Sequence, residues 1–161
     1  MTLISSISGI RGTVNGPNST NLTPIDVVKY ASAYGTWVNK RNKNKDSTIV
    51  IGRDGRISGP ALLELVKSTL ISMGINIIDI DLSTTPTTQI LIQKKKANGG
   101  IILTASHNPK NWNALKLFNS KGEFLVKKEA EEIFKIVKEN QFEFKGEDNF
   151  GKISKISDAF K

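Results

Sequence analysis

The chain has 161 residues, a length that suits one domain with a sizeable hydrophobic core. Its hydrophobic residues (38%) and charged residues (24%) are typical of a folded soluble protein and exclude a disordered one. Cysteine is absent, which excludes disulfides and thiolate metal sites. No apolar run approaches the ~20 residues of a membrane helix and the first residues lack a signal peptide, so we expect a cytoplasmic protein without membrane partners.

The formal net charge of +8 raises the question of a nucleic-acid partner. The lysines of residues 40–45 and 94–96 fall near the expected ends of separate helices, where cations complement the helix dipole. Aromatic residues make up 7% of the chain and do not interleave with the lysines as a base-stacking surface requires. We therefore expect no nucleic-acid partner.

Two short patterns open the chain. Residues 7–14 predict a strand in which Gly9 and Gly12 flank Arg11, so that the backbone there can approach a ligand closely. A helix is predicted from Pro24 to near Asn42, with Thr23 as its N-cap and Asp26 completing a capping box. The residues expected to face the core from this helix are Ile25, Val28, Ala31 and Val38.

Three apolar runs, residues 48–51, 75–80 and 99–103, predict buried strands separated by helices. The first of these helices begins at Pro60, stops at Gly74 and presents Leu63, Val66 and Leu70 to the core. The second repeats the Thr-Pro start at Thr85 and stops before Gly99.

The rest of the chain predicts a strand over 114–118, a turn over 120–122 leading into 123–125, and a helix over 128–139 with Ile133, Ile136 and Val137 facing inward. Alternating strands and helices predict an α/β fold in three layers, with helices on both faces of a mixed, mostly parallel sheet. The hairpin-like segment is expected to form an antiparallel edge. We expect one domain over residues 1–145 and a linker over 146–161, where periodicity has faded.

Three loops that follow strands carry residues suited to chemistry: Arg11, then Arg53 with Asp54 and Arg56, then Ser106 with the only histidine, His107. Arginine beside glycine suits phosphate, because guanidinium binds it in bidentate fashion and glycine lets backbone N–H groups approach. The alternative for Arg53 and Asp54 is a salt bridge that fixes the loop.

Ser106 lies where ligands bind in open α/β sheets, just beyond the carboxyl end of a strand. The alternatives are an ordinary polar turn, or a hydrolase dyad in which His107 activates the serine. The absence of a Gly-x-Ser-x-Gly elbow weakens the dyad. Asp79 and Asp81 resemble a metal pair, but no third ligand is nearby in sequence, so we interpret them as structural.

The string Thr104-Ala105-Ser106-His107-Asn108-Pro109 resembles the phosphoserine signature of the α-D-phosphohexomutase superfamily (phosphoglucomutase, phosphomannomutase and phosphoglucosamine mutase). Three further segments resemble family motifs in the same order along the chain. They are the arginine loop Gly9-Ile10-Arg11-Gly12, the Gly-Arg-Asp-x-Arg-x-Ser segment within 52–59, and Asn113-Ala114-Leu115-Lys116 for Asn-Gly-x-Lys.

The resemblance implies that Ser106 is carried as a phosphoserine and exchanges its phosphoryl group with a hexose phosphate substrate. The exchange passes through a hexose 1,6-bisphosphate. Arg11 and Lys116 match positions for proton transfer and phosphoryl stabilisation, and His107 and Asn108 match residues that line the serine loop. Arg53, Asp54 and Arg56 are expected to brace the loops.

The resemblance covers the first domain of the family only. Its three further domains hold a magnesium loop, a sugar-selecting loop and a phosphate-clamping loop, none of which occurs in this chain. The resemblance implies one Mg²⁺ per active site, to which Ser106 contributes one ligand through its phosphate. We therefore expect a fragment of a longer enzyme, inactive as a mutase alone, whose partners are the downstream domains.

Ala114 departs from the family pattern at a usual glycine. Two alternative functions stay open: a non-catalytic phosphosugar-binding or regulatory module of the same fold, and a serine phosphotransferase or esterase that acts by itself.

Overall fold

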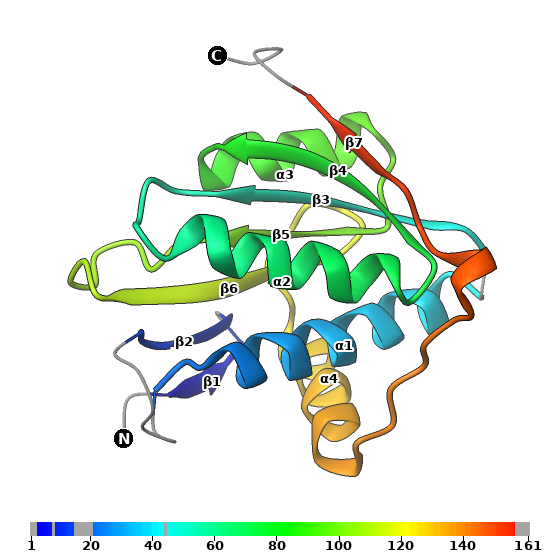
Figure 1. Cartoon of the computed structure of the whole chain (residues 1–161), viewed down its shortest axis with the longest axis horizontal. Coiled ribbons are helices and arrows are strands. Elements are labelled where there is room, and N and C mark those ends of the chain that lie inside the picture. The colour runs from blue at the N-terminus through cyan, green and yellow to red at the C-terminus, as the bar shows by residue number, and fades with distance from the viewer. Residues whose placement is uncertain (1–2, 8, 15–20, 44, 157–161) are drawn as a thin grey trace.

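The computed structural model of the chain describes residues 3–7, 9–14, 21–43 and 45–156. Its centre is a seven-stranded sheet with the strand order β1-β2-β6-β5-β3-β4-β7 (Figure 1). The strands are β1 (Ile4–Ser6), β2 (Gly9–Thr13), β3 (Ser47–Arg53), β4 (Ile75–Leu82), β5 (Gly99–Leu103), β6 (Trp112–Phe118) and β7 (Ile153–Lys155).

The sheet is mixed, and most of its strands run in one direction. The pairs β5–β3, β3–β4 and β4–β7 are parallel, whereas β5–β6, β6–β2 and β2–β1 are antiparallel. Strands β2, β5, β3, β4 and β7 therefore share a direction, and β6 and β1 oppose it. The carboxyl ends of β3 and β5 consequently lie at the same edge of the sheet, which brings the loops that follow them together.

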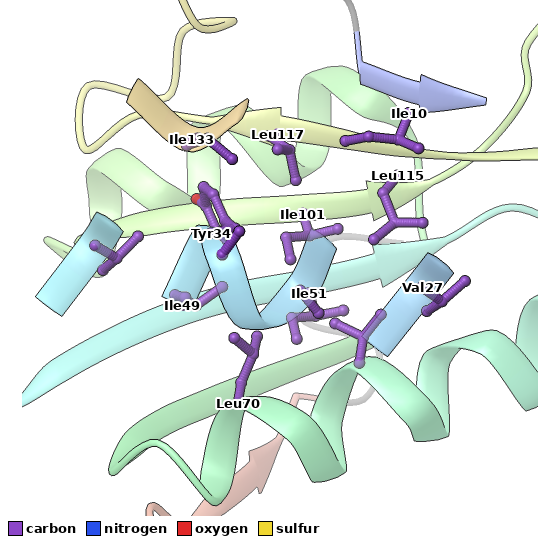
Figure 2. Close-up of a cluster of buried hydrophobic side chains, with 14 of the residues drawn as sticks. Ile10, Val27, Tyr34, Ile49, Ile51, Leu70, Ile101, Leu115, Leu117 and Ile133 are labelled. Atoms are coloured by element: carbon purple, nitrogen blue, oxygen red, sulfur yellow. The ribbon is translucent and has the colours of Figure 1, made fainter. Parts of the chain in front are cut away.

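Helices cover both faces of the sheet, as the sequence predicted. Helices α1 (Pro24–Arg41), α2 (Gly59–Ile71) and α4 (Lys127–Glu139) pack on one face, and α3 (Thr85–Lys94) packs on the other (Figure 1). The larger core, on the α1 face, surrounds the buried ring of Tyr34 (Figure 2). The smaller core lies beneath α3 and includes Leu91, Ile92 and Ile102. A 3₁₀ turn (Glu147–Asn149) precedes β7.

The predicted ends of the helices follow local hydrogen bonds. The capping box of α1 is confirmed: the Asp26 carboxylate accepts from the Thr23 backbone N–H at 2.8 Å, and the Asp26 N–H donates to the Thr23 hydroxyl at 3.3 Å. For α3 the prediction was wrong by one residue, because the Thr84 hydroxyl caps the helix and Thr85 is its first residue. The inward residues Leu63, Val66 and Leu70 of α2 are buried as predicted.

The predicted core stripe of α1 is wrong at its start. Ile25 and Val28 are 78% and 36% exposed, whereas Val27, Tyr34 and Trp37 are buried with Ala31 and Val38. The apolar pattern allowed two neighbouring stripes, and packing against β5, β6 and α4 selects the one that buries the large aromatic rings.

The antiparallel edge of the sheet comes from another part of the chain than predicted. Residues 123–125 form only an isolated bridge, between Phe118 and Phe124, and β6 lies inside the sheet. The Asn119 side chain accepts from the backbone N–H groups of Lys121 and Glu123, which closes a tight turn directly before α4. The antiparallel edge is instead the β1–β2 hairpin.

Part of the segment expected to be a linker belongs to the sheet. Residues 153–155 form β7, paired in parallel with β4, and the Ile156 N–H donates to Asp79 O at 3.0 Å. Residues 157–161 lie outside the described residues. No helix of the described parts is both long enough and apolar enough to cross a membrane.

Candidate active site

The serine loop, residues 104–111, leaves the carboxyl end of β5 and returns into β6. Ser106 has a left-handed backbone with φ of +53°, and its N–H donates to the Thr104 hydroxyl at 3.2 Å. The Asn108 N–H donates to Ala105 O at 3.0 Å, which closes the turn around the serine. Ser106 and His107 are exposed, so a locally ordered turn presents the serine at the edge of the sheet.

The side chain of Arg56 holds the serine loop by donating hydrogen bonds to main-chain carbonyl oxygens in and next to the loop. Its Nη1 donates to Pro109 O at 2.6 Å and Trp112 O at 2.9 Å, and its Nη2 donates to Ser106 O at 3.1 Å and Asn108 O at 2.9 Å. Its Nε donates to the Asp54 carboxylate at 3.2 Å. All five N–H donors of the guanidinium therefore have protein acceptors, and none is left for a phosphate.

Arg53 and Asp54 do not form the salt bridge with each other that the sequence left open. Arg53 Nε donates to the Asp81 carboxylate at 2.8 Å, and its Nη1 donates to Asp54 O at 3.2 Å. The Asp54 carboxylate instead accepts from the Arg56 backbone N–H at 3.0 Å as well as from the Arg56 side chain. Each arginine thus has its own acidic partner.

Arg11 and Lys116 lie beside each other on the α3 face of the sheet. Arg11 pairs with Ala114 across β2 and β6, and Lys116 pairs with Ile102 across β6 and β5. Because residues two apart in a strand point to the same face, Arg11, Ala114 and Lys116 share the face on which Ile102 packs under α3. No carboxylate of the described residues lies within 4.0 Å of either cation.

The sheet register places Arg11 level with the start of the serine loop, and Lys116 opposite Ile102 in the strand before the loop. The N–H of Thr104, the first residue of the loop, donates to Ala114 O at 3.1 Å, and Ala114 is the partner of Arg11. Arg11 is two strands from β5, about 10 Å at the usual strand spacing, and Lys116 is one strand away. Two cations that make no ion pair with the described residues, on strands next to the one that leads into the serine loop, suit a phosphoryl group.

Two polar residues to which the sequence analysis gave no role of their own, Asn113 and Ser58, support this end of the sheet. The buried Asn113 amide donates to the Ser58 hydroxyl at 2.9 Å and accepts from the Ala114 N–H at 2.9 Å. This ties the start of β6 to the loop after β3. Both residues occur in motifs, but nothing local in the sequence indicates that they are partners. Ala114 itself lies in regular strand pairing, which any residue can adopt.

Residues 4–144 match the family described as "Phosphoglucomutase/phosphomannomutase, alpha/beta/alpha domain I". The chain belongs to the phosphoglucomutase/phosphomannomutase family. It is 38% identical over 125 residues to a phosphoglucomutase/phosphomannomutase of Thermococcus kodakarensis, which covers 78% of this chain and 26% of that protein. It is 36% identical over 133 residues to a phosphoglucosamine mutase of Alkaliphilus metalliredigens, which covers 83% of this chain and 28% of that protein.

A solved structure of a phosphoglucomutase/phosphomannomutase family protein from Burkholderia thailandensis has the same fold. It aligns with a TM-score of 0.75 at 23% identity, over 93% of this chain and 32% of that one. The chain thus spans about a quarter to a third of the length of these relatives, and it corresponds to domain I of the phosphohexomutases.

The two aspartates that resemble a metal pair have protein partners in this phosphohexomutase domain. The Asp79 carboxylate accepts from Lys67 Nζ at 2.9 Å and from the Asp81 N–H at 2.9 Å, and Asp81 pairs with Arg53. Within the described ranges, no three histidine or acidic residues cluster closely enough to hold a metal ion. Asp54, the acidic residue bonded to Arg56 beside the serine loop, is already engaged.

Proposed function

We propose that Ser106 accepts and returns the phosphoryl group in a phosphohexomutase that interconverts hexose 1-phosphates and hexose 6-phosphates. The observation that carries the proposal is the position of Ser106: exposed, in a turn held by Arg56, after the strand next to those that bear Arg11 and Lys116, two cations with no ion pair among the described residues. Family membership supports the same reaction class, since the relatives are named as hexose phosphate mutases.

The reaction consists of two phosphoryl transfers in opposite directions. In the first, the phosphoserine Oγ–P bond breaks while a hydroxyl oxygen of the hexose phosphate forms a new O–P bond, and the hydroxyl proton passes to Oγ. The product is a hexose 1,6-bisphosphate. In the second, Ser106 Oγ attacks the other phosphoryl group, its proton is transferred to the departing sugar oxygen, and the phosphoserine is restored.

Each charged residue of the site has a role that fits this chemistry. Arg11 and Lys116 supply positive charge to the oxygens of the transferring group, where electrostatic stabilisation contributes most to phosphoryl transfer. A proton must also reach or leave the reacting oxygen, and Lys116 and Arg11 are our candidates for holding it. His107 and Asn108 line the loop around the serine and contact substrate phosphate. Arg53, Asp54 and Arg56 brace the loops.

The part of the chain that the structure describes offers too few ligands for a complete Mg²⁺ site. Magnesium prefers octahedral oxygen coordination, and phosphorylated Ser106 would contribute one phosphate oxygen. The described residues hold no acidic cluster that could complete the coordination, and the Asp54 carboxylate is bonded to Arg56. The residues that the structure describes therefore do not fit a self-contained metal site.

Phosphoryl uptake by the chain tests the role of Ser106. Incubation with glucose 1,6-bisphosphate should add one phosphoryl group in intact-mass spectrometry, and fragmentation should locate it on Ser106. The variant Ser106→Ala should take up none. Uptake at another residue, equal uptake by Ser106→Ala, or no uptake over a range of bisphosphate concentrations and pH would overturn the proposal.

Complete turnover is expected to require more than this chain. A coupled assay that detects conversion of glucose 1-phosphate to glucose 6-phosphate should give no turnover with the 161-residue chain alone, because substrate must be held at both of its ends. Turnover at a rate typical of enzymes, about 10 per second, would contradict this.

A further inference from the structure

Asp81 stands at an irregularity in the sheet. In the pairing of β3 with β4, Ile51 faces Asp79 and Gly52 faces Asp81, so Ile80 is an extra residue that forms a β-bulge. Asp81 has a φ of +47°, and its N–H donates to the Asp79 carboxylate at 2.9 Å. Bulges of this kind redirect a side chain, and here the carboxylate of Asp81 meets Arg53 Nε at 2.8 Å.

The bulge has a buried anchor. The side chains of Lys67 and Asp79 are 6% and 4% exposed, and they form an ion pair at 2.9 Å between α2 and β4. Burial alone would lower the pKa of Lys67, but hydrogen bonds and charge interactions with Glu64 and Asp79 outweigh it and leave that pKa raised. Lys67 therefore stays charged at neutral pH and binds one oxygen of the Asp79 carboxylate. The other oxygen of that carboxylate accepts the hydrogen bond from the Asp81 N–H.

A continuous series of contacts leads from Asp81 to the serine loop. Asp81 holds Arg53, whose Nη1 donates to Asp54 O at 3.2 Å. The Asp54 carboxylate accepts from both the backbone and the side chain of Arg56, and Arg56 binds four carbonyl oxygens in and next to the serine loop. Every step is a hydrogen bond between charged or main-chain groups of defined geometry.

We propose that Asp81, through Arg53, is a positioning residue for phosphoryl transfer at Ser106. The inference rests on the proposed function and adds a residue that touches neither serine nor substrate. Asp81 carries backbone strain that only Gly, Asn or Asp tolerate well, and at 58% exposure its carboxylate adds little to stability. We infer that the strained backbone at Asp81 is kept because it orients Arg53 and the loop that follows Arg53.

The experiment compares Asp81→Gly and Asp81→Asn with the parent chain. Both substitutes tolerate a positive φ, so the bulge is expected to remain folded. The rate of phosphoryl uptake by Ser106 from glucose 1,6-bisphosphate is measured at saturating and limiting donor. We expect Asp81→Gly to lower the saturated rate roughly tenfold. A misplacement of about 1 Å can cost about a hundredfold, and the bonds of Arg56 to the loop keep the displacement smaller than that.

The same variants should separate positioning from binding and from folding. The donor concentration for half-maximal rate should stay unchanged, because Arg11 and Lys116 bind the donor. Asp81→Asn, whose amide oxygen can still accept from Arg53, should recover part of the rate. Arg53→Met should lower the rate at least as much as Asp81→Gly, because it also removes the bond to Asp54 O. Adding Asp81→Gly to Arg53→Met should lower the rate no further, since Asp81 acts through Arg53.

Glu143→Gln is the matched control. It removes the exposed ion pair of Glu143 with Lys40, at 3.7 Å and 48% exposure of each side chain, between the end of α1 and the segment that follows α4. Its uptake rate should equal that of the parent. Saturated rates of the Asp81 and Arg53 variants that equal the parent rate, or that fall only with the fraction unfolded, would overturn the inference. Failure of the parent chain itself to take up phosphoryl would instead count against the proposed function.

Discussion

Arg56 Nη2 donates a hydrogen bond of 3.1 Å to the carbonyl oxygen of Ser106, a residue 50 positions further along the chain. Three more carbonyl oxygens, of Asn108, Pro109 and Trp112, share the same guanidinium. The conformation of the candidate catalytic turn is therefore set by a side chain from the loop after a neighbouring strand.

Replacing this arginine should damage the loop even when the positive charge is kept. Lysine has a single ammonium and cannot reach four carbonyls and a carboxylate together. Because the Arg56 side chain is only 12% exposed, we expect Arg56→Lys to lower the free energy of unfolding by about 3 kcal/mol. Urea unfolding measures this change. Arg41→Lys, at a half-exposed arginine, should cost less than about 1 kcal/mol; equal losses would contradict the role of Arg56.

Serine at position 106 is expected to be required for phosphoryl uptake but to lower the free energy of unfolding relative to glycine. Its φ of +53° costs an L-residue roughly 1–2 kcal/mol, part of which glycine avoids. We therefore expect Ser106→Gly to unfold at slightly higher urea concentration than the parent, by about 0.5 kcal/mol, while losing phosphoryl uptake. Ser106→Val, which is branched at Cβ, should be less stable than both. A Ser106→Gly variant clearly less stable than the parent would show that the hydroxyl supports the turn.

Tyr34 and Gly99 should show strong energetic coupling. The Tyr34 hydroxyl donates to Phe118 O at 2.6 Å and accepts from the Gly100 N–H at 2.9 Å, bridging β5 and β6 at the centre of the core (Figure 2). A Cβ at Gly99 would lie 2.2 Å from that hydroxyl oxygen but 3.3 Å from the ring carbon that carries it. Gly99→Ala should therefore be severely destabilising in the parent and much milder in a Tyr34→Phe background.

A double-mutant cycle measures this coupling. Tyr34→Phe alone should lower the free energy of unfolding by about 1–3 kcal/mol, because it leaves the buried Phe118 O and Gly100 N–H without the hydroxyl. The interaction between the two substitutions should exceed about 1 kcal/mol, in the favourable direction. Additive effects would mean that the backbone at Gly99, rather than the hydroxyl, limits the side chain there.

The chain should lose stability above about pH 10. Burial raises the pKa of Tyr34 from its usual 10.0, and the acidic neighbours of Lys67 outweigh burial and raise its pKa above 10.5. As the pH rises past these values, the unfolded chain releases both protons while the folded chain keeps them, so unfolding becomes easier. Each group contributes a slope of up to about 1.4 kcal/mol per pH unit.

Urea unfolding from about pH 8 to about pH 11 tests this dependence. Tyr34→Phe and Lys67→Met should each lose stability less steeply than the parent in the alkaline range, although both start from lower stability at pH 8. Identical slopes in the parent and in both variants would contradict the assignment.

Much of the fold follows from interactions within a few residues, and these the sequence determined. The capping box joins Thr23 to Asp26, three residues away, and the left-handed Asn140 ends α4 where the predicted helix stops. Apolar runs bounded by turns predicted β3, β4 and β5, and a specific six-residue string placed Ser106 after β5 and indicated the family. Local hydrogen bonds and side-chain periodicity suffice for such features, since both can be counted along the chain.

The tertiary structure decided whatever depends on the pairing of distant segments. The buried face of α1 depends on Tyr34 reaching Gly100 and Phe118, 66 and 84 residues away. The carboxylate that pairs with Arg53 is that of Asp81, 28 residues further on, rather than that of the adjacent Asp54. Strand β7 pairs with β4 across more than 70 residues. Strand order and register choose these partners. Strand order and register are set by the free energy of burying the whole sheet between two layers of helices. That free energy depends on residues from the entire chain, so no single stretch of sequence determines it.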